Sequence, residues 1–486
     1  MYLTFLSEPP SDGLVIPLAQ DSRLAPQLES LAASLRVRTE LLQAGFQGEW
    51  KEQFSLLTPL GRIWLLGLGK SPGLPQALAA FRSLAHRQQR VLPASVAVEL
   101  REPPMPRALL AEAAVGGLVL GRYDLGLYKT GRTAPGPFLG DLAGISLIMP
   151  PDAEAEQRAI QGRTVAEVQL RVMDLVNRPA NKLFPADLAA WAKASGEQYG
   201  YHVSVLEPLQ MESLGMHALL AVARGSENPP AFIVAEHLAD PGGPVYGLAG
   251  KGVTFDTGGI SIKDSANMHY MKCDMAGAAA VLGAVELAAR LQAPVNLVAV
   301  AAAAENMIGP QAVRPGDVIG SYAGKTVEVI DTDAEGRLLL ADALAWLGRT
   351  YTPSLMIDLA TLTGSCVAAL GYHAAGLFTG SEALAQRLLA AGDRSGERLW
   401  RLPLWEAYGD ELKSDVADVK NFHGKPVAGA IVAAKFLEAF TDEHPAWAHL
   451  DIAGTAYVDS EFASFRSASA YGVRLLASAL FPGFSD

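Results

Sequence analysis

The pattern of hydrophobic and polar positions predicts a small α/β domain over residues 1–150. Short apolar runs at 63–68 and 144–149 have the length of buried strands. The segments 74–87 and 106–117 instead repeat their apolar residues at roughly helical spacing. This part of the chain carries no recognisable pattern of catalytic residues.

A single long helix is predicted between this domain and the rest of the chain. The sequence MPPDA, with two adjacent prolines, breaks the preceding pattern. Apolar residues then recur near helical spacing from 153 to 176. We therefore expect an N-terminal domain at 1–150, a linking helix at 151–176 and a larger domain at 177–486.

From residue 180 onward, strand-like and helix-like runs alternate, which predicts βαβ units and a mostly parallel central sheet flanked by helices. Apolar or β-branched runs that predict strands lie at 231–235, 245–255, 295–302, 326–331, 354–360 and 447–453. Ala/Leu-rich runs that predict helices lie at 275–292, 338–349, 382–392 and 428–441. In open sheets of this kind, ligands bind beyond the carboxyl ends of the strands. Most of the polar residues discussed below come just after strand-like runs.

Composition narrows the class of protein. The chain has 486 residues, of which 50% are hydrophobic and 19% charged, so it is too long for one ordinary core and too apolar for disorder. Its formal net charge of -12 argues against a protein that binds duplex nucleic acid by neutralising phosphates.

The same composition predicts a soluble protein of the cytoplasm. The first residues lack the basic and apolar regions of a secretory signal. The apolar stretch at 295–304 is too short for a membrane span, and Glu112 interrupts the one at 108–120. Two cysteines are too few for a disulfide framework in a chain of this size.

The most informative segment is TVEVIDTDAEGR, in which a β-branched run leads into charged residues at alternate positions. These residues are Asp331, Asp333, Glu335 and Arg337. In an extended chain all four would lie on one face. Carboxylates on one face repel one another unless a cation compensates them. A solvated acidic edge strand is the alternative, but the apolar run that follows weakens it, so the segment favours a metal or anion site.

Two further segments supply candidate ligands. The first carries Lys251, Asp256 and Lys263 among five glycines, which allow the backbone to approach a ligand closely. Taken alone, it fits a glycine-rich surface turn equally well. In the second, Asp274 immediately precedes a small-residue helix. By itself, this residue fits a helix N-cap.

Together these groups form a carboxylate-rich set with no histidine at ligand spacing. Such a set favours hard or borderline cations such as Mn, Mg, Zn or Co. Several carboxylates in one pocket can bridge two ions about 3.5–4 Å apart, which activates water and polarises a carbonyl or phosphoryl oxygen. The residues therefore predict a metal-dependent hydrolase without fixing the metal.

These segments resemble the leucine aminopeptidase (cytosol aminopeptidase) family, whose hallmark NTDAEGR run is preceded by a KGVTFDTGG-like run. The chain has KGVTFDTGG at 251–259 and DTDAEGR at 331–337. The resemblance continues through VNRPANKLFP, AENMIGPQAVRPGDVI, DLATLTGSCVAALG and WAHLDIAGTAY, and it covers the chain after about residue 165. Two departures are Asp331, where the family has Asn, and the loop 307–313. Neither departure removes a ligand.

The resemblance implies a two-metal aminopeptidase that releases Leu-like residues from peptides with a free N-terminus. The implied ligands form two sites that share two carboxylates: Lys251, Asp256, Asp274 and Glu335 in one site, and Asp256, Asp333 and Glu335 in the other. It also implies that Lys263 stabilises the developing oxyanion and that Arg337 holds a bicarbonate ion acting as general base. A charge-balancing role beside the acidic cluster is the alternative for both of these residues, and a purely structural cation is the alternative for Lys251.

Further expectations rest on the same resemblance. It implies two divalent ions per subunit, Mn or Zn, and a homohexamer. It also places four residues near the pocket for the first side chain and the peptide backbone: Met271, Thr361, Leu362 and Gly364. An apolar Met or Leu is equally typical of plain core.

Two other functions compete with this one. A DNA-binding or scaffold protein on the same fold is opposed by the intact ligand set and the acidic balance. A two-metal phosphohydrolase is opposed by the lysine ligand and by the extent of the resemblance to peptidases.

Overall fold

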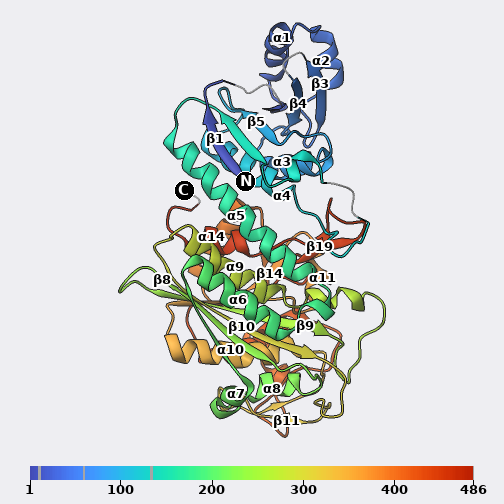
Figure 1. Ribbon diagram of the computed structural model, residues 1–486. Helices are drawn as coiled ribbons and strands as arrows, with labels where there is room; N and C mark the ends of the chain where they lie inside the picture. The colour runs from blue at the N-terminus through green and yellow to red at the C-terminus, as the bar shows by residue number, and fades with distance from the viewer. Residues whose placement is uncertain (9–12, 59–60, 132–134, 485–486) are drawn as a thin grey trace. The chain divides into compact units, whose positions relative to one another are not determined.

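The computed structural model describes residues 1–8, 13–58, 61–131 and 135–484, and these residues divide into two units. Unit 1 comprises Met1–Leu170 with Ser460–Ser464, and unit 2 comprises the remainder. The predicted linking helix is observed as α5 (Ala153–Asn177), within which unit 1 passes into unit 2 (Figure 1). Among the described residues, no helix is both long and apolar enough to cross a membrane.

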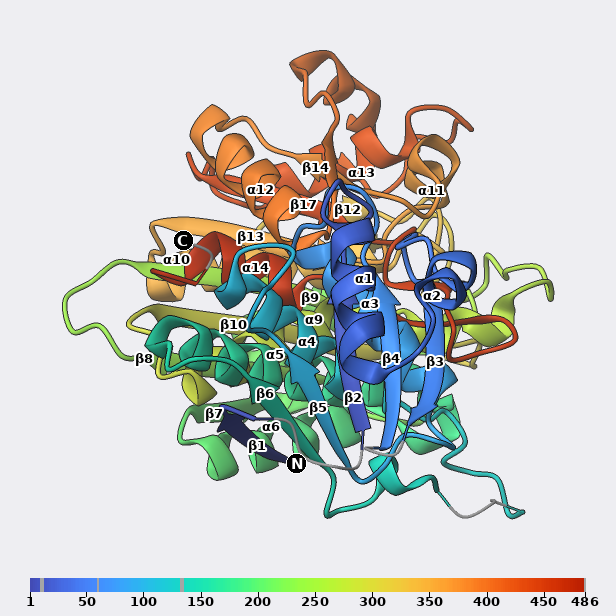
Figure 2. The ribbon, with the colours of Figure 1, turned by 90° about the horizontal axis from the view of Figure 1, so that it is seen from above.

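The described strands of unit 1 form one six-stranded sheet in the order β1-β6-β5-β2-β4-β3 (Figure 2). Their bounds are β1 (Tyr2–Leu6), β2 (Gly13–Leu18), β3 (Gln53–Thr58), β4 (Gly61–Gly67), β5 (Ser95–Glu99) and β6 (Gly144–Ile148). Neighbours pair in parallel, except β3 with β4. The helices of this unit before α5 are α1 (Leu24–Leu35), α2 (Thr39–Gly45), α3 (Leu74–Arg87) and α4 (Arg107–Leu120). The predicted α/β character of this part of the chain is confirmed.

The described part of unit 2 contains an eight-stranded sheet in the order β15-β14-β17-β13-β9-β10-β8-β7. Its strands are β7 (His202–Leu206), β8 (Ala231–Leu238), β9 (Val245–Asp256), β10 (Asn296–Asn306), β13 (Leu355–Ala360), β14 (Ala375–Phe378), β15 (Leu399–Arg401) and β17 (Trp447–Asp451). The central run β17-β13-β9-β10 is parallel, whereas β7, β8 and β14 form the antiparallel pairs. The predicted mostly parallel centre is therefore confirmed.

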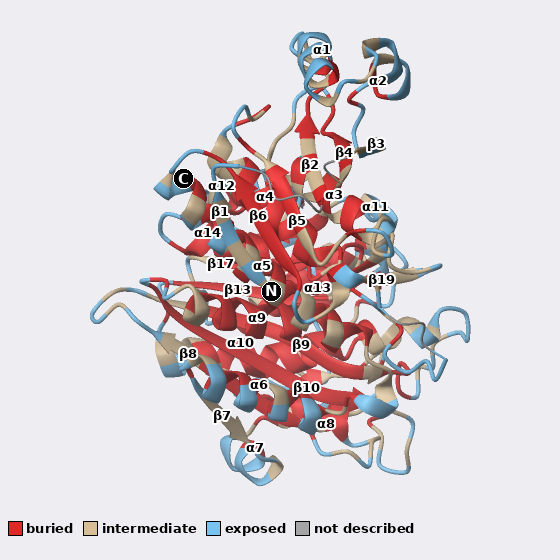
Figure 3. Ribbon diagram, turned by 45° about the horizontal axis from the view of Figure 1, so that its top comes forward, coloured by how far each residue is buried: buried red, intermediate tan, exposed pale blue. Residues whose placement is uncertain are grey.

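Helices cover both faces of this central sheet. The described α-helices that follow α5 are α6 (Pro185–Tyr199), α7 (Pro208–Leu214), α8 (His217–Ala223), α9 (Ala276–Arg290), α10 (Gly336–Tyr351), α11 (Gly364–Leu370), α12 (Glu382–Ser395), α13 (Gly429–Glu438) and α14 (Val473–Leu480). Figure 1 shows α9 and α10 on opposite sides of β9 and β10, and both helices contact these strands. Every residue of β10 is buried, as expected for a strand covered on both faces (Figure 3).

Small residues let α9 approach the sheet closely. A Cβ atom built on Gly250 would lie 2.6 Å from the backbone of Ala278, so only glycine fits there. The packing brings the first turn of α9, which follows Asp274, against the middle of β9. This contact places a candidate ligand from one element beside candidates from another.

The predicted strand at 326–331 is wrong beyond its first residues. Only Val327–Glu328 form a strand, β12, which lies between β11 (Val318–Ile319) and β16 (Val419–Lys420). The following N–H groups of Ile330 and Asp331 donate to the side-chain oxygen of Asn421, at 2.8 and 3.3 Å. A side chain far along the chain thus replaces the strand partner, and the chain turns.

Candidate metal centre

The candidate site lies at the carboxyl ends of adjacent strands of unit 2. Asp256 is the last residue of β9, Asn306 is the last of β10, and Thr361 directly follows β13. Because β9, β10 and β13 are parallel neighbours, their carboxyl ends meet at one edge of the sheet. This is the position at which ligands bind in open α/β sheets.

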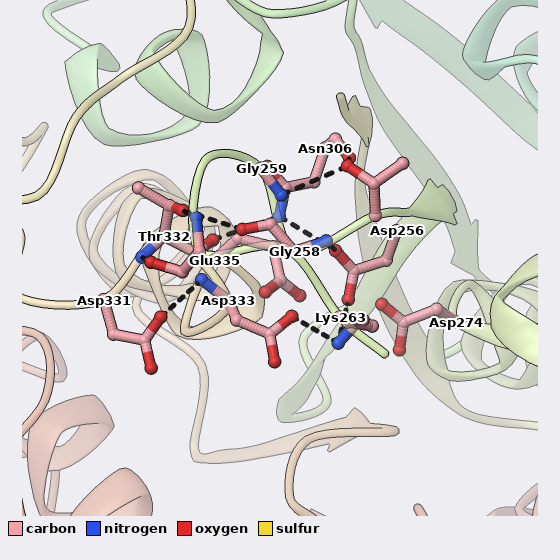
Figure 4. Close-up of polar contacts among 12 residues, drawn as sticks. Asp256, Gly258, Gly259, Lys263, Asp274, Asn306, Asp331, Thr332, Asp333 and Glu335 are labelled. Atoms are coloured by element: carbon pink, nitrogen blue, oxygen red, sulfur yellow. Dashed lines mark hydrogen bonds and ion pairs between the residues drawn. The ribbon is translucent and has the colours of Figure 1, made fainter. Parts of the chain in front are cut away.

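A tight turn brings the acidic motif to the same edge. The Asp331 carboxylate accepts a hydrogen bond from the backbone N–H of Asp333 (2.9 Å), which is an Asx turn. Glu335 then precedes α10. The expected arrangement of alternating side chains on one extended face is therefore wrong. The turn instead directs the Asp333 and Glu335 carboxylates toward Asp256 and Lys263 (Figure 4).

Three carboxylates form the centre of the cluster. Asp256, Asp333 and Glu335 each offer one oxygen, and these oxygens lie within 4.8 Å of one another. Asp256 and Glu335 are almost fully buried, whereas the Asp333 side chain is 35% exposed. The cluster is therefore closed on one side and open beside Asp333.

Two lysines neutralise part of the negative charge of the cluster. The Lys251 ammonium lies 2.8 Å from Asp274 Oδ2 and 2.7 Å from Glu335 Oε1. Lys263 lies 2.7 Å from Asp256 Oδ2 and also pairs with Asp333. All five residues that the sequence resemblance gave as ligands thus lie in one connected group, together with Lys263.

Burial makes this concentration of charge unfavourable. It raises the pKa of Asp274 to about 8 against the pull of the Lys251 ammonium, and it raises the pKa of Asp333 to about 7. Burial also opposes ionisation of Glu335, but the two lysines hold the pKa of Glu335 below its ordinary value. The cluster is electrostatically short of positive charge, which a divalent cation would supply.

Hydrogen bonding indicates the same need. Among the described residues, Glu335 Oε2 has no hydrogen-bond partner, and Asp274 Oδ2 has none besides the Lys251 ammonium 2.8 Å away. A buried oxygen left without a donor costs about 1–3 kcal/mol. Converging buried oxygens with unused lone pairs fit a hard or borderline cation.

Arg337 lies in the first turn of α10 and is buried. Its Nη1 donates to the backbone oxygen of Asn421 (2.7 Å), while its Nε has no hydrogen-bond partner among the described residues. Burial lowers the pKa of Arg337 to about 10. The residue therefore has a cationic donor available for an anion.

The four candidate substrate residues differ in how directly they meet the cluster. Thr361 contacts it through two hydrogen bonds, to Lys251 and Asp274. Leu362 is partly buried, and Gly364 opens α11 with open space where a Cβ would be. Met271 lies in the 3-10 helix Met268–Cys273 that leads to Asp274.

Two residues that were not identified as candidates from the sequence also organise the site. Asn306 Nδ2 donates to Asp256 Oδ1 (2.8 Å) and to the Thr332 oxygen (3.0 Å), which ties the end of β9 to the acidic turn. Asp451 accepts hydrogen bonds from the loop after β13, including one from Thr363 Oγ1 at 2.6 Å. Their position as last residues of β10 and β17, at the same sheet edge, was the signal that could have identified them.

Comparisons with known proteins agree with this geometry. A family profile described as the cytosol aminopeptidase family, catalytic domain, matches residues 171–477. A probable cytosol aminopeptidase of Chloroherpeton thalassium is 42% identical, and the alignment covers 96% of each chain.

Two solved structures are similar over nearly the whole chain. A mutant of tomato leucine aminopeptidase has a TM-score of 0.88 at 33% identity, covering 99% of this chain and 96% of that one. The bottromycin maturation enzyme BotP in complex with Mn has a TM-score of 0.84 at 32% identity, covering 96% of this chain and 98% of that one.

Proposed function

Because the chain belongs to the cytosol aminopeptidase family and is a metal-dependent aminopeptidase, we propose that it releases Leu-like N-terminal residues from peptides at the acidic cluster of unit 2. The observation that carries the proposal is the convergence of three carboxylates at one sheet edge, two of them buried, where Glu335 Oε2 has no hydrogen-bond partner among the described residues. The ligands we propose for two divalent cations form one set: Lys251, Asp256, Asp274, Asp333 and Glu335.

The cations, when bound, would polarise the scissile carbonyl and lower the pKa of water. Asp256 and Glu335 would contribute to both cation sites. Lys251 must lose a proton to act as a ligand, and this loss couples its ligation to cation binding.

The residues around the ligands supply the remaining roles. Lys263 lies at the open side of the cluster, with its side chain 22% exposed, where its positive charge would stabilise the oxyanion that develops on the carbonyl oxygen. Arg337 offers its unpartnered Nε to a small anion, which we propose is bicarbonate accepting a proton as general base. Met271, Thr361, Leu362 and Gly364 are proposed to surround the first side chain and the adjoining peptide backbone.

Several broader features belong to the same proposal. We assign the catalytic domain to 177–486, the N-terminal domain to 1–150 and the linking segment to 151–176. Mn or Zn is proposed as the metal, and BotP has been solved with Mn. A cytoplasmic location is supported by two free, buried cysteines and by the names of the relatives. A homohexamer is proposed, which light scattering would detect as six chain masses.

The alternative of a DNA-binding or scaffold protein finds no support in the family match or in the similar structures. A phosphohydrolase is likewise not supported, because the matched family is one of peptidases.

The test is hydrolysis of Leu-p-nitroanilide by the full chain, stripped with chelator and then reloaded with Mn or Zn. Cleavage should disappear on stripping and return with metal, while N-acetyl-Leu-p-nitroanilide stays intact because its amine cannot bind. Asp256→Asn should abolish cleavage. Asp264→Asn changes an exposed carboxylate eight residues further along the chain and should leave cleavage unchanged. If the protein cleaves Leu-p-nitroanilide neither with Mn nor with Zn, the proposal is refuted.

A further inference from the structure

Thr361 contacts two of the proposed ligands at once. Its hydroxyl donates a hydrogen bond to Asp274 Oδ1 at 2.7 Å. Its backbone oxygen accepts a hydrogen bond from the Lys251 ammonium at 3.0 Å. Asp274 and Lys251 both belong to the same proposed cation site, and neither belongs to the other.

The hydroxyl decides which Asp274 oxygen is free for a cation. Oδ1 accepts the Thr361 hydroxyl, whereas Oδ2 is buried and faces the ammonium of Lys251, the other unshared ligand of this site, at 2.8 Å. Without the hydroxyl, the carboxylate would keep only its contact with Lys251 and could rotate more freely about its last bond. Partners of this kind typically change metal affinity by about 10–100-fold.

The neighbouring backbone is itself fixed. Asp451, which is fully buried, accepts hydrogen bonds from the N–H groups of Leu362 (3.2 Å) and Thr363 (3.5 Å) and from the Thr363 hydroxyl (2.6 Å). The backbone of Thr361 is therefore fixed by the ends of β13 and β17. Its hydroxyl can restrain the Asp274 side chain because Thr361 itself does not move with that side chain.

The ligands Asp256 and Asp333 of the other proposed site are held without Thr361. Asp256 Oδ1 accepts hydrogen bonds from the Gly258 N–H and from Asn306 Nδ2, both at 2.8 Å. Asp333 is held through its backbone N–H by Asp331. Neither interaction involves Thr361, so loss of its hydroxyl should affect one site and spare the other.

We propose that Thr361 is a positioning residue for the cation site formed by Lys251, Asp256, Asp274 and Glu335, with its hydroxyl holding Asp274 for coordination through one oxygen. This inference rests on the proposed ligand set. It gives the Thr361 side chain a role separate from contact with the substrate.

The test measures cation binding without catalysis. Chelator-stripped full-length protein is titrated with Mn²⁺, and free Mn²⁺ is followed by electron paramagnetic resonance. Wild type should bind two equivalents. Thr361→Val, which has nearly the same shape but no hydroxyl, should weaken one equivalent by about 10-fold or more and leave the other unchanged. The weakened equivalent should be the one that Asp274→Asn removes.

Two controls separate positioning from general damage. Thr361→Ser keeps the hydroxyl and should restore wild-type binding. Thr379→Val removes another buried hydroxyl, which donates to the Trp447 oxygen at 2.6 Å, and should lower the melting temperature without changing either dissociation constant.

The outcomes distinguish this inference from the proposed function. Two unchanged equivalents in Thr361→Val would overturn the inference alone, as would equal weakening of both equivalents. A wild-type chain that binds no Mn²⁺ would overturn the proposed ligand set and this inference with it.

Discussion

At the scale of single residues, differences in exposure show which side of the cluster is open to solvent. Lys251 and Asp274 are 3% and 5% exposed, whereas the Lys263 and Asp333 side chains are 22% and 35% exposed. A peptide must therefore extend outward on the side of Lys263 and Asp333, because protein closes the opposite side. An oxyanion-stabilising role suits Lys263 better than Lys251 for the same reason.

Asp331, which stands where the family has Asn, lies beside this open side. Its carboxylate accepts the Asp333 N–H at 2.9 Å, and an asparagine side-chain oxygen can accept the same bond. We therefore expect Asp331→Asn to keep the turn and the melting temperature. Loss of one partly screened negative charge should weaken cation binding a few-fold. A Mn²⁺ titration checks this, and binding curves identical to those of wild type would show that the Asp331 charge has no effect on the site.

At the scale of elements, local patterns predicted most strands and helices of unit 2, but not the acidic turn. The apolar run at 295–302 gave β10, and the Ala-rich run at 275–292 gave α9, because burial on both faces requires continuous apolar sequence. The run at 326–331 has the same β-branched character. It turns because Asn421, about ninety residues away, takes the N–H groups that a strand partner would otherwise bind. That contact has no local signal in the sequence.

The candidate ligands show the same limit. Their identities followed from residue types and a family resemblance, whereas their convergence depends on parallel strands ending at one edge. The hydrogen-bond partners of Asn306 and Thr361 could not be predicted, even though the position of Asn306 at the sheet edge could mark it as a candidate. These partners depend on how separate elements align.

The start of α10 lies so close to the Lys251 side chain of β9 that a substitution there should disturb the site. A Cβ atom on Gly336 would lie 2.6–2.8 Å from the end of the Lys251 side chain, which can move only by leaving its carboxylate partners. On Gly348 in the same helix, it would meet only the Met356 side chain at 3.7–3.8 Å. We expect Gly336→Ala to lower Mn²⁺ affinity and peptidase activity. Gly348→Ala should stabilise the protein by about 0.5–1 kcal/mol, because alanine favours a helix.

Thermal melting and Mn²⁺ titration of both glycine variants check this prediction. Equal behaviour of the two variants would contradict it, since helix propensity alone makes no distinction between the positions.

Asp342 in α10 links stability to pH. It is fully buried, and its two oxygens accept the N–H groups of Leu219 and Tyr322 at 2.9 and 2.8 Å. Burial raises the pKa of Asp342 from 3.8 to about 7. The folded protein therefore binds this proton more tightly than the unfolded chain does. The stability that this gives is present below about pH 4 and is lost as the pH rises toward 7.

Asp342→Asn removes this titration. We expect the melting temperature of wild type to fall more steeply between pH 4.5 and 7 than that of the variant, at constant ionic strength. The variant should also be less stable at every pH, because its amide cannot accept both N–H groups. Parallel melting curves across this range would show that Asp342 does not titrate there.

At the scale of the whole molecule, each unit has its own hydrophobic core. In unit 1 the core includes Trp64, Leu66 and Phe81, and in unit 2 it includes Phe232, Leu344 and Phe436. All the proposed cation ligands belong to unit 2. A ligand that binds only the folded form of one unit stabilises that unit by mass action.

Calorimetry of the full chain should therefore resolve two transitions, of which added Mn²⁺ raises only one. Leu66→Ala, which removes buried side-chain volume in unit 1, should lower the Mn²⁺-insensitive transition, because such truncations cost about 2–5 kcal/mol. Asp274→Asn should reduce the response of the other transition to Mn²⁺. One transition that moves as a whole with both Mn²⁺ and Leu66→Ala would instead mean that the units unfold together, and that the cation cluster stabilises the whole chain rather than the unit that contains it.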